Sequence, residues 1–301
     1  MNPSSQGSRS PSNYVTLFHI KTPKTLLLHR KVRNMSQVVV ITGVTSGFGK
    51  ATAALLVSRG YTVYGISRRT IPDGTGITGI TADVRDSDAV SDAIRQIVSK
   101  EGGIDILINN AGIGIGGCLE LASTDDISLQ MDTNFMGCVN LCRAVLPHMR
   151  KRRNGRIINI SSIGGVMGLP YQGYYSASKF AIEGFSEALS AEVRRFGISV
   201  SLVEPGDFST AFTANRKNSR SCMEDPDYGP SFKRSLETIE NEENSGLNPE
   251  KLARTILNIV KSRHPKMRYV VAGFEQRASV CLKKILPDRM FVKILEKYYR
   301  C

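Results

Sequence analysis

A strand, a glycine-rich turn and a helix follow one another near residue 40, and this order constrains the fold more than any other feature of the chain. Residues 38–41 are a run of β-branched side chains, which is typical of a buried strand in a parallel sheet. The T-G-x-x-x-G-x-G segment at 42–49 then leads into good helix formers at 50–56. Glycines at these positions permit a tight turn, a close approach to a pyrophosphate and close packing of the helix on the sheet. The pattern predicts a dinucleotide-binding unit, with a plain glycine-rich loop as the alternative.

Short apolar runs alternate with helical segments from residue 38 to about residue 203, and this alternation indicates the fold class. We expect strands at 38–41, 62–66, just before Asp83, at 104–108, 156–160 and 198–203, and a seventh at 267–271. The sequence therefore predicts an α/β fold, a Rossmann-type doubly wound parallel sheet of about seven strands with helices on both faces. Residues 35–301 are expected to form this single domain.

The second expected strand ends in Ser67-Arg68-Arg69, without a carboxylate. Sites for NAD usually have Asp or Glu near this position, where it holds the ribose 2′-hydroxyl. A guanidinium group binds a 2′-phosphate well, whereas a carboxylate would repel it. The sequence thus favours NADP(H) over NAD(H), with Arg68 as the phosphate contact, assisted by Ser67 and Ser46. The alternative is that both arginines are merely solvated.

A tyrosine and a lysine stand four residues apart in Tyr175-Ser176-Ala177-Ser178-Lys179. On a helix this spacing places both side chains on one face, within reach of the same small molecule. A tyrosine hydroxyl has a pKa near ~10, which a neighbouring ammonium group lowers. A decrease of ~3 units needs ~4 kcal/mol, which a lysine and a cationic cofactor ring could supply in a closed site. The pair is a candidate acid–base centre, and a solvated helix face is the alternative.

In their order along residues 37–210, these motifs resemble those of the short-chain dehydrogenase/reductase family. The further matches are Asp83-Val84, Asn109-Asn110-Ala111-Gly112, Asn134, Ser162 thirteen residues before Tyr175, and the P-G-x-x-x-T segment from Pro205 to Thr210. The glycine turn also has this family's spacing and not that of longer-chain dehydrogenases. The resemblance implies an oxidoreductase that transfers a hydride between a nicotinamide and a carbonyl or alcohol carbon.

The same resemblance implies four catalytic residues, Asn134, Ser162, Tyr175 and Lys179. Tyr175 would exchange a proton with the substrate oxygen and Ser162 would donate a hydrogen bond to it, so these two are the expected substrate contacts. Lys179 would lower the pKa of Tyr175 and bind the nicotinamide ribose, and Asn134 would support a water beside Lys179. The alternatives are that Ser162 caps a strand end and that Asn134 is a helix-interior polar group bonded to the backbone.

Cofactor contacts are expected in several segments of the chain. They are Gly43, Thr45, Ser46, Gly47, Phe48, Gly49, Ser67, Arg68, Asp83, Val84, Asn110, Ala111, Gly112, Tyr175, Lys179, Pro205, Gly206, Phe208 and Thr210. By the resemblance, Asp83 contacts the adenine and residues 205–210 lie beside the nicotinamide. Cys138 and Cys142 have a spacing that could bind a metal but no third ligand nearby, so no metal site is expected.

Residues 211–247 are polar and are expected to form a loop-like substrate lid, where the family places a mobile one. Phe208, Phe212, Tyr228 and Phe232 could line the pocket or simply pack within the lid. No cation is placed to hold an acidic substrate, so we expect an apolar pocket for a lipophilic ketone, aldehyde or secondary alcohol, by analogy with steroid and retinol dehydrogenases. The alternatives are an NAD(H)-dependent oxidative dehydrogenase and a non-catalytic NADP(H) sensor.

The net charge of +13 is concentrated at the two ends of the chain. Residues 1–36 have six basic and no acidic side chains, and residues 261–301 have eleven basic and three acidic ones. No nucleic-acid-binding motif accompanies them, so a nucleic-acid partner is not expected. The C-terminal segment 279–295 is basic and amphipathic. We favour packing or a subunit contact for it over closure of the substrate mouth or weak contact with an anionic membrane.

Residues 1–34 precede Met35 and are expected to be disordered, either as sequence upstream of the true start or as a transit peptide. No apolar run reaches the ~18 residues that span a bilayer, so no transmembrane segment is expected. Six cysteines without C-x-x-C pairs indicate free thiols in a reducing compartment, which favours a cytoplasmic protein. The family resemblance implies a homodimer or homotetramer.

Overall fold

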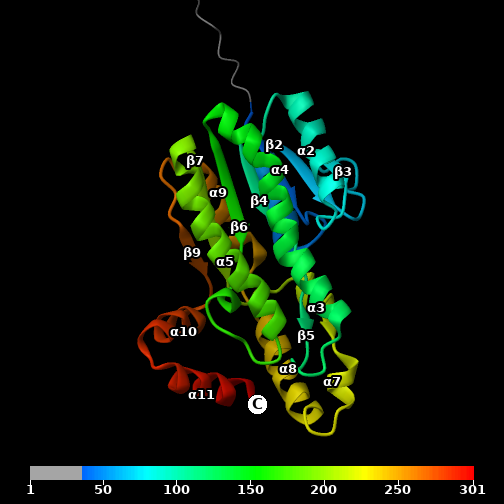
Figure 1. The fold of residues 1–301 in the computed structure, drawn as a ribbon, viewed down its shortest axis with the longest axis vertical. Helices are drawn as coiled ribbons and strands as arrows, with labels where there is room; N and C mark the ends of the chain where they lie inside the picture. The colour runs from blue at the N-terminus through cyan, green and yellow to red at the C-terminus, as the bar shows by residue number, and fades with distance from the viewer. Residues whose placement is uncertain (1–35) are drawn as a thin grey trace, which may run out of the picture. The chain divides into compact units, whose positions relative to one another are not determined.

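Seven parallel strands form the central sheet, in the order β3-β2-β1-β4-β6-β7-β9 (Figure 1). The computed structural model describes residues 36–301, so the expectation for residues 1–34 lies outside the described residues. The strands are β1 (Val38–Thr42), β2 (Thr62–Ser67), β3 (Ile77–Thr81), β4 (Ile106–Asn109), β6 (Gly155–Ile160), β7 (Ile198–Pro205) and β9 (Arg268–Val271). The predicted doubly wound parallel sheet is confirmed, and its sixth and seventh strands are β7 and β9.

Successive side chains of each strand alternate between the two faces of the sheet, and each face has its own helices. Val38 and Val40 of β1 pack on one face with the apolar sides of α2, α4 and α5, while Val39 and Ile41 pack on the other with α1 and α9. Figure 1 shows α2, α4 and α5 in front of the sheet and α9 behind it. These helices are α1 (Gly47–Ser58), α2 (Ser87–Glu101), α4 (Gly137–Arg152), α5 (Gly173–Val193) and α9 (Pro249–Lys261).

The strand order places a crevice beside the carboxyl end of β1. From β1 the chain builds outward through β2 to β3, and it then crosses to β4 on the other side of β1. The connections after β1 and β4 therefore diverge, and an open α/β sheet binds its ligands at such a point. The glycine turn after β1 and the Asn109–Gly112 segment after β4 meet there, as hydrogen bonds from Asn110 to the backbone of the turn show.

The expectation of a loop-like lid at 211–247 is wrong, because most of this segment is helical. It contains α6 (Ala211–Ala214), the short strand β8 (Lys217–Asn218), α7 (Arg220–Glu224) and α8 (Gly229–Asn244). In α8, Pro230 lies at the first turn, and Phe232 and Ile239 point inward at helical spacing. Because many polar residues surround these few apolar ones, the helical period is hard to recognise in the sequence. β8 pairs with β5 (Ile115–Gly116), which joins residues 211–247 to the segment after β4.

Two helices end the chain, α10 (Phe274–Ile285) and α11 (Asp288–Tyr299). Their inner sides pack on the turn after β6, where Val280 and Phe291 form a small core with Ile163 and Met167. In Figure 1 these helices lie at the same end of residues 36–301 as α7 and α8. Within residues 36–301, no helix is long and apolar enough to cross a membrane.

The remaining elements are short and join these larger ones. They are α3 (Thr124–Met131), the π-helix η1 (Asp132–Met136), and the 3-10 helices η2 (Ile163–Gly165) and η3 (Arg194–Phe196).

Candidate active site

The turn after β1 has the geometry that its glycines were expected to provide. Gly43 and Gly47 have φ angles of 71° and 51°, which side chains rarely adopt. A Cβ atom on Gly49 would lie 2.2 Å from the Gly43 carbonyl oxygen, so Gly49 allows the helix to pack against the turn. Gly49 lines neither cavity of the site, and its role is packing rather than direct contact.

The start of α1 suits a phosphate group. Ser46 is the N-cap residue, yet its side chain makes no capping hydrogen bond, and the first turn contains no acidic residue. The N–H groups of this turn are therefore available to an anion, which the helix dipole also favours. A Cβ atom on Gly47 would lie 3.6 Å from Cβ of Thr210, within the space beside the turn. The residues present thus fit the pyrophosphate of a dinucleotide.

A groove of about 620 Å³ extends from this turn along the carboxyl ends of β1, β2 and β4. Thirteen of the expected cofactor contacts line it: Gly43, Thr45, Ser46, Gly47, Phe48, Ser67, Arg68, Asp83, Val84, Asn110, Ala111, Gly112 and Thr210. Sequence reasoning did not assign the other lining residues, Ile66, Arg69, Ala82, Ile113, Gly114, Thr133, Phe212 and Asn215, as cofactor contacts.

Two arginines lie at the end of the groove beside β2. Arg69 donates a hydrogen bond from Nη2 to Thr45 Oγ1 over 3.0 Å, and its backbone N–H donates to Ser67 Oγ. Arg68 lines the same groove and is exposed. Among residues 36–301, Asp83 is the one carboxylate that lines the groove. This end of the groove therefore has the positive charge that a phosphate monoester requires.

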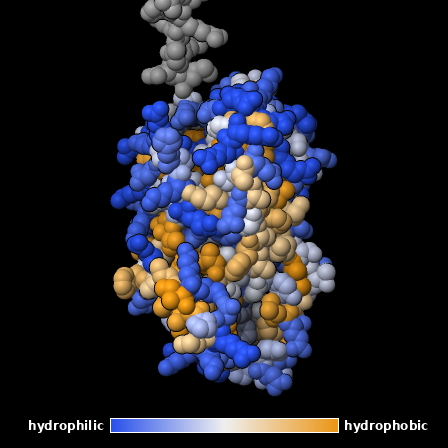
Figure 2. Space-filling view, turned by 60° about the vertical axis from the view of Figure 1, so that its left-hand side comes forward, coloured by the Kyte–Doolittle hydropathy of each residue, from blue (hydrophilic) through white to orange (hydrophobic). Residues whose placement is uncertain are grey.

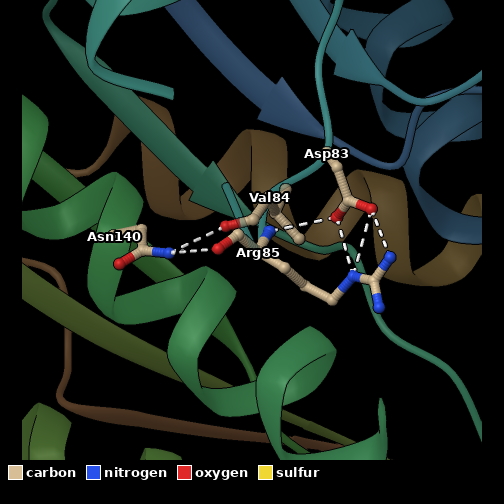
Figure 3. A network of polar contacts seen from close by, with 4 residues as sticks. All are labelled: Asp83, Val84, Arg85 and Asn140. Atoms are coloured by element: carbon tan, nitrogen blue, oxygen red, sulfur yellow. Dashed lines mark hydrogen bonds and ion pairs between the residues drawn. The ribbon is translucent and has the colours of Figure 1, made fainter. Parts of the chain in front are cut away.

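Asp83 is held by a neighbouring arginine rather than left free (Figure 3). Arg85 donates to both oxygens of Asp83 from its guanidinium group, with a shortest distance of 2.7 Å. These bonds hold the pKa of Asp83 below its usual range. Asn140 of α4, which sequence reasoning missed, donates 3.0 Å to the Val84 carbonyl and so fixes the same loop from the other side. The end of the groove at Asp83 and Val84 is thereby held from two sides.

A second cavity, of about 110 Å³, contains the expected acid–base residues. Ser162, Tyr175 and Lys179 line it, together with Pro205, Gly206 and Phe208. It shares Phe48, Asn110, Gly112, Thr210 and Phe212 with the cofactor groove, so a molecule in the groove reaches the second cavity. Tyr175 and Lys179 lie on α5, and Ser162 is the second residue after β6. Ser162 Oγ accepts a hydrogen bond from Gly164 N, so it also caps η2.

The expected decrease in the pKa of Tyr175 is not found in this structure. Burial raises the pKa of Tyr175 to about 12, although a hydrogen bond with Ser162 opposes the increase. Lys179 Nζ lies 5.7 Å from the centroid of the tyrosine ring and donates 2.9 Å to the Ile160 carbonyl oxygen. Burial also lowers the pKa of Lys179 to about 8. Removal from water is the largest cause of both shifts and favours the neutral form of both groups.

Asn134 lies in the π-helix η1, and its side chain lines neither cavity. Its amide accepts a hydrogen bond from Ile113 N over 2.8 Å and donates to the Ile113 carbonyl and to Ser178 Oγ. The bonds to Ile113 agree with the alternative interpretation, in which Asn134 is a polar group inside a helix that bonds to the backbone. They also join the segment after β4 to α5 one residue before Lys179. A one-turn π-helix is frequent at functional sites.

The apolar substrate pocket that we expected is wrong in one respect, because three carboxyl groups line the cavity. They belong to Asp207, which follows β7, and to Glu242 and Glu243 of α8. Burial, together with the charges of Glu242 and Glu243, raises the pKa of Asp207 to about 7. Asp207 accepts a hydrogen bond from Gln276, Glu242 from Tyr298, and Glu243 from Thr213 and Arg216. Asp207 stands in the sequence between two expected cofactor contacts, Gly206 and Phe208, and its position there was the signal for a carboxyl group in the site.

The other walls of the cavity are largely apolar. They include Ile163, Leu169, Phe212 and Ile239, with Tyr299 from the last turn of α11. The ring of Phe212 lies 5.9 Å from that of Tyr175. Phe208 and Phe212 therefore line the site, whereas Tyr228 and Phe232 pack with Cys118 and Cys222 in a separate cluster. The cavity combines an apolar surface with an acidic region.

Comparison with known proteins agrees with this architecture. The model of the short chain dehydrogenase family matches residues 37–221. A 3-ketodihydrosphingosine reductase from Bacteroides thetaiotaomicron is 52% identical over 263 residues, which cover 87% of this chain and 98% of the relative. Retinol dehydrogenase 8 from Bos taurus is 36% identical and is covered over 80% of its length, with 77% of this chain. A solved short-chain dehydrogenase from Streptomyces avermitilis superposes with a TM-score of 0.74 at 30% identity, covering 88% of this chain and 97% of that one.

The chain belongs to the short-chain dehydrogenase/reductase family. It is an oxidoreductase that uses a nicotinamide cofactor.

Proposed function

We propose that the protein is an NADP(H)-dependent reductase of long-chain ketones that carry an amine on the carbon next to the carbonyl. The observation that carries this proposal is the joint lining of one cavity by Ser162, Tyr175 and the carboxyl groups of Asp207, Glu242 and Glu243. 3-Ketodihydrosphingosine, which names the Bacteroides relative, is a ketone of this kind. The apolar walls suit its alkyl chain and the carboxyl groups suit its ammonium group.

In this proposal Tyr175 is the general acid. When bound, the nicotinamide supplies the hydride that reaches the carbonyl carbon. Tyr175 gives its phenol proton to the carbonyl oxygen, so that the ketone becomes a secondary alcohol. A pKa of about 12 keeps Tyr175 protonated near neutral pH, which supports the reductive direction. Ser162 donates a hydrogen bond to the same oxygen and holds it beside Tyr175.

Lys179 and Asn134 support this proton transfer. The ammonium group of Lys179 stabilises the phenolate that Tyr175 leaves behind and also binds the nicotinamide ribose. Asn134 positions Lys179, because its amide ties Ser178 to the segment after β4. We propose Arg68 as the contact to the 2′-phosphate, with Ser67 and Ser46 beside it. The remaining expected cofactor contacts keep their proposed roles in the groove, with Gly49 acting through packing.

The direct test compares two ketones of equal chain length with NADPH as the reductant. One is 3-ketodihydrosphingosine, and the matched control is the same 3-ketone without the amine. We expect kcat/KM to be at least about tenfold higher for the amino ketone, because a hydrogen bond to a charged group contributes about 1.5–3 kcal/mol. Equal values for the two ketones would contradict the recognition of the amine. Absence of NADPH oxidation with both would overturn the proposed reductase activity.

A further inference from the structure

Exposed hydrophobic side chains are concentrated on the two C-terminal helices. Ten large hydrophobic side chains are exposed among residues 36–301, and seven of them lie on α10 and α11. These seven are Phe274, Leu282, Ile285, Met290, Val292, Ile294 and Tyr298. Phe274 and Ile285 are 88% and 78% exposed, values that are unusual for side chains of this size. Scattered single residues need no explanation, but a group of this kind indicates an interaction surface.

The spacing of these residues shows that each helix has an outward apolar stripe. Phe274, Cys281 and Ile285 lie along one side of α10, at about 100° or more around the helix from the buried Val280. Met290, Ile294 and Tyr298, four residues apart, lie along one line of α11, next to its buried stripe. Figure 2 brings forward the side of the molecule that carries both helices in Figure 1, and orange side chains gather there among blue ones.

Basic side chains accompany both stripes. Residues 274–301 contain seven basic and three acidic side chains. Among residues 36–301, Lys283 is the one basic residue of this segment in an ion pair, with Asp288. Arg277 and Lys284 flank the stripe of α10, and Lys293 and Lys297 flank that of α11. A helix with an apolar stripe bordered by cations fits the boundary between the headgroups and acyl chains of a bilayer.

The charge also distinguishes an anionic membrane from a second copy of the chain. A two-fold contact through this surface would place one net positive segment against an identical one, and like charges at close range oppose association. Anionic phospholipid headgroups have the complementary charge.

The inner sides of the same helices reach the active site. Tyr299 of α11 lines the catalytic cavity, and its carbonyl oxygen accepts a hydrogen bond from Ser235 of the lid helix α8. Gln276 of α10 accepts 3.1 Å from the backbone N–H of Asp207, which also lines the cavity. Phe291 packs with Ile163, the residue after Ser162. One side of this helix pair therefore forms part of the cavity wall while the other is exposed.

We propose that the outer face of α10 and α11 docks on an anionic lipid bilayer, so that a long-chain substrate enters the catalytic cavity directly from the membrane. The route of entry rests on the proposed function, whereas docking itself does not. Phe274, Ile285 and Ile294 insert among the acyl chains, and Lys284, Lys293 and Lys297 contact the headgroups.

Sedimentation of the full chain with vesicles tests the docking. We expect binding at physiological salt to phosphatidylcholine vesicles containing phosphatidylglycerol, and at least about tenfold weaker binding to phosphatidylcholine alone. The double variants Phe274→Ser/Ile285→Ser and Lys284→Glu/Lys293→Glu should each weaken binding to anionic vesicles by about tenfold or more. The controls Leu119→Ser and Lys151→Glu, which change an exposed leucine and an exposed lysine elsewhere, should bind as the unchanged protein does.

A second measurement separates docking from catalysis and from loss of folding. All variants should keep their circular dichroism spectrum and their kcat/KM for a short, water-soluble amino ketone, while the two double variants lose rate on substrate embedded in anionic vesicles. Failure of the unchanged protein to sediment with anionic vesicles would overturn the proposal. So would a dimer in light scattering that Phe274→Ser/Ile285→Ser converts to monomers, which would assign the surface to a second copy. Absence of turnover with intact sedimentation would instead contradict only the proposed function.

Discussion

Asp207 differs from Tyr175, whose pKa is about 12, because the ionisation of Asp207 changes near neutral pH. Its pKa of about 7 results from burial and from the charges of Glu242 and Glu243. An ammonium group bound between these carboxyl groups would favour the ionised form. Below the pKa, Asp207 must therefore lose a proton before it can pair with the ammonium group of a substrate.

The pH dependence of KM follows from this ionisation. For the amino ketone, we expect KM to fall by up to about tenfold per unit as pH rises from about 5 to about 7, and then to level off. The ketone without the amine should show no such decrease. The variant Asp207→Asn, which keeps the hydrogen-bonding shape, should remove the pH dependence for the amino ketone. Steady-state kinetics over this pH range give the answer, and the same profile for both ketones would exclude pairing with Asp207.

Arg68 is the residue on which the cofactor preference depends. Removal of its guanidinium in Arg68→Ala should weaken NADPH binding by about tenfold or more, because charge-assisted bonds to a phosphate contribute ~1.5–3 kcal/mol. NADH has no 2′-phosphate, so its affinity should stay within about twofold. Calorimetric titration measures both, and Arg69→Ala is the comparison variant because Arg69 is already bonded to Thr45. A larger loss in Arg69→Ala than in Arg68→Ala would transfer the assignment to Arg69.

At the scale of elements, the sequence predicted the strands and helices in which apolar residues recur regularly. It did not predict those in which the few apolar residues lie among polar ones. The β-branched run of β1 and the glycine turn predicted the sheet and the nucleotide groove, and both β7 and β9 were expected in their places. The helix α8 was missed, because Phe232 and Ile239 lie among charged residues. With α8 missed, Glu242 and Glu243 could not be placed in the cavity. The order of residues along a chain does not show which distant segment closes a pocket.

The packing of α1 on the glycine turn can be tested without touching a cofactor contact. In Gly49→Ala, the added Cβ would lie 2.2 Å from the Gly43 carbonyl oxygen and 2.6 Å from Asn110 Nδ2, so the turn must move. We expect the free energy of unfolding to fall by about 1–3 kcal/mol and NADPH affinity to fall at least about tenfold. The control Ala54→Gly, on an exposed position of the same helix, should cost about 0.5–1 kcal/mol and leave NADPH affinity unchanged. Urea unfolding and calorimetry give both quantities, and unchanged affinity in Gly49→Ala would contradict this role.

At the scale of the whole molecule, the site is assembled from segments spread over most of residues 36–301. Both cavities, the helical segment 211–247 and the C-terminal helices lie within residues 36–301. The residues that line the cavities come from six or more separate segments of the chain. The sequence predicted that such residues lie together only where the family resemblance implied it, as for Ser162 and Tyr175. Tyr299, at the end of α11, lines the catalytic cavity, and no motif in the sequence predicted this.

A chain that begins at Met35 should therefore keep its activity. We expect kcat/KM and the affinity for NADPH to remain within about twofold of the full chain, because every group of the site found among residues 36–301 is retained. Side-by-side kinetics of the two proteins provide the comparison. A tenfold or greater decrease in the shortened protein would show that residues 1–34 contribute to the site.

The central claim, that Tyr175 is the proton donor for hydride transfer, is tested most directly by Tyr175→Phe beside Tyr174→Phe. The neighbouring Tyr174 hydroxyl donates 3.4 Å to the Leu119 carbonyl outside the catalytic cavity, so its removal is a matched control. General acid catalysis contributes ~10²–10⁴-fold, so Tyr175→Phe should lose at least about 100-fold in kcat with NADPH and a ketone. It should still bind NADPH within about threefold, and Tyr174→Phe should keep full turnover. Turnover of Tyr175→Phe within a few fold of the unchanged protein would contradict the claim.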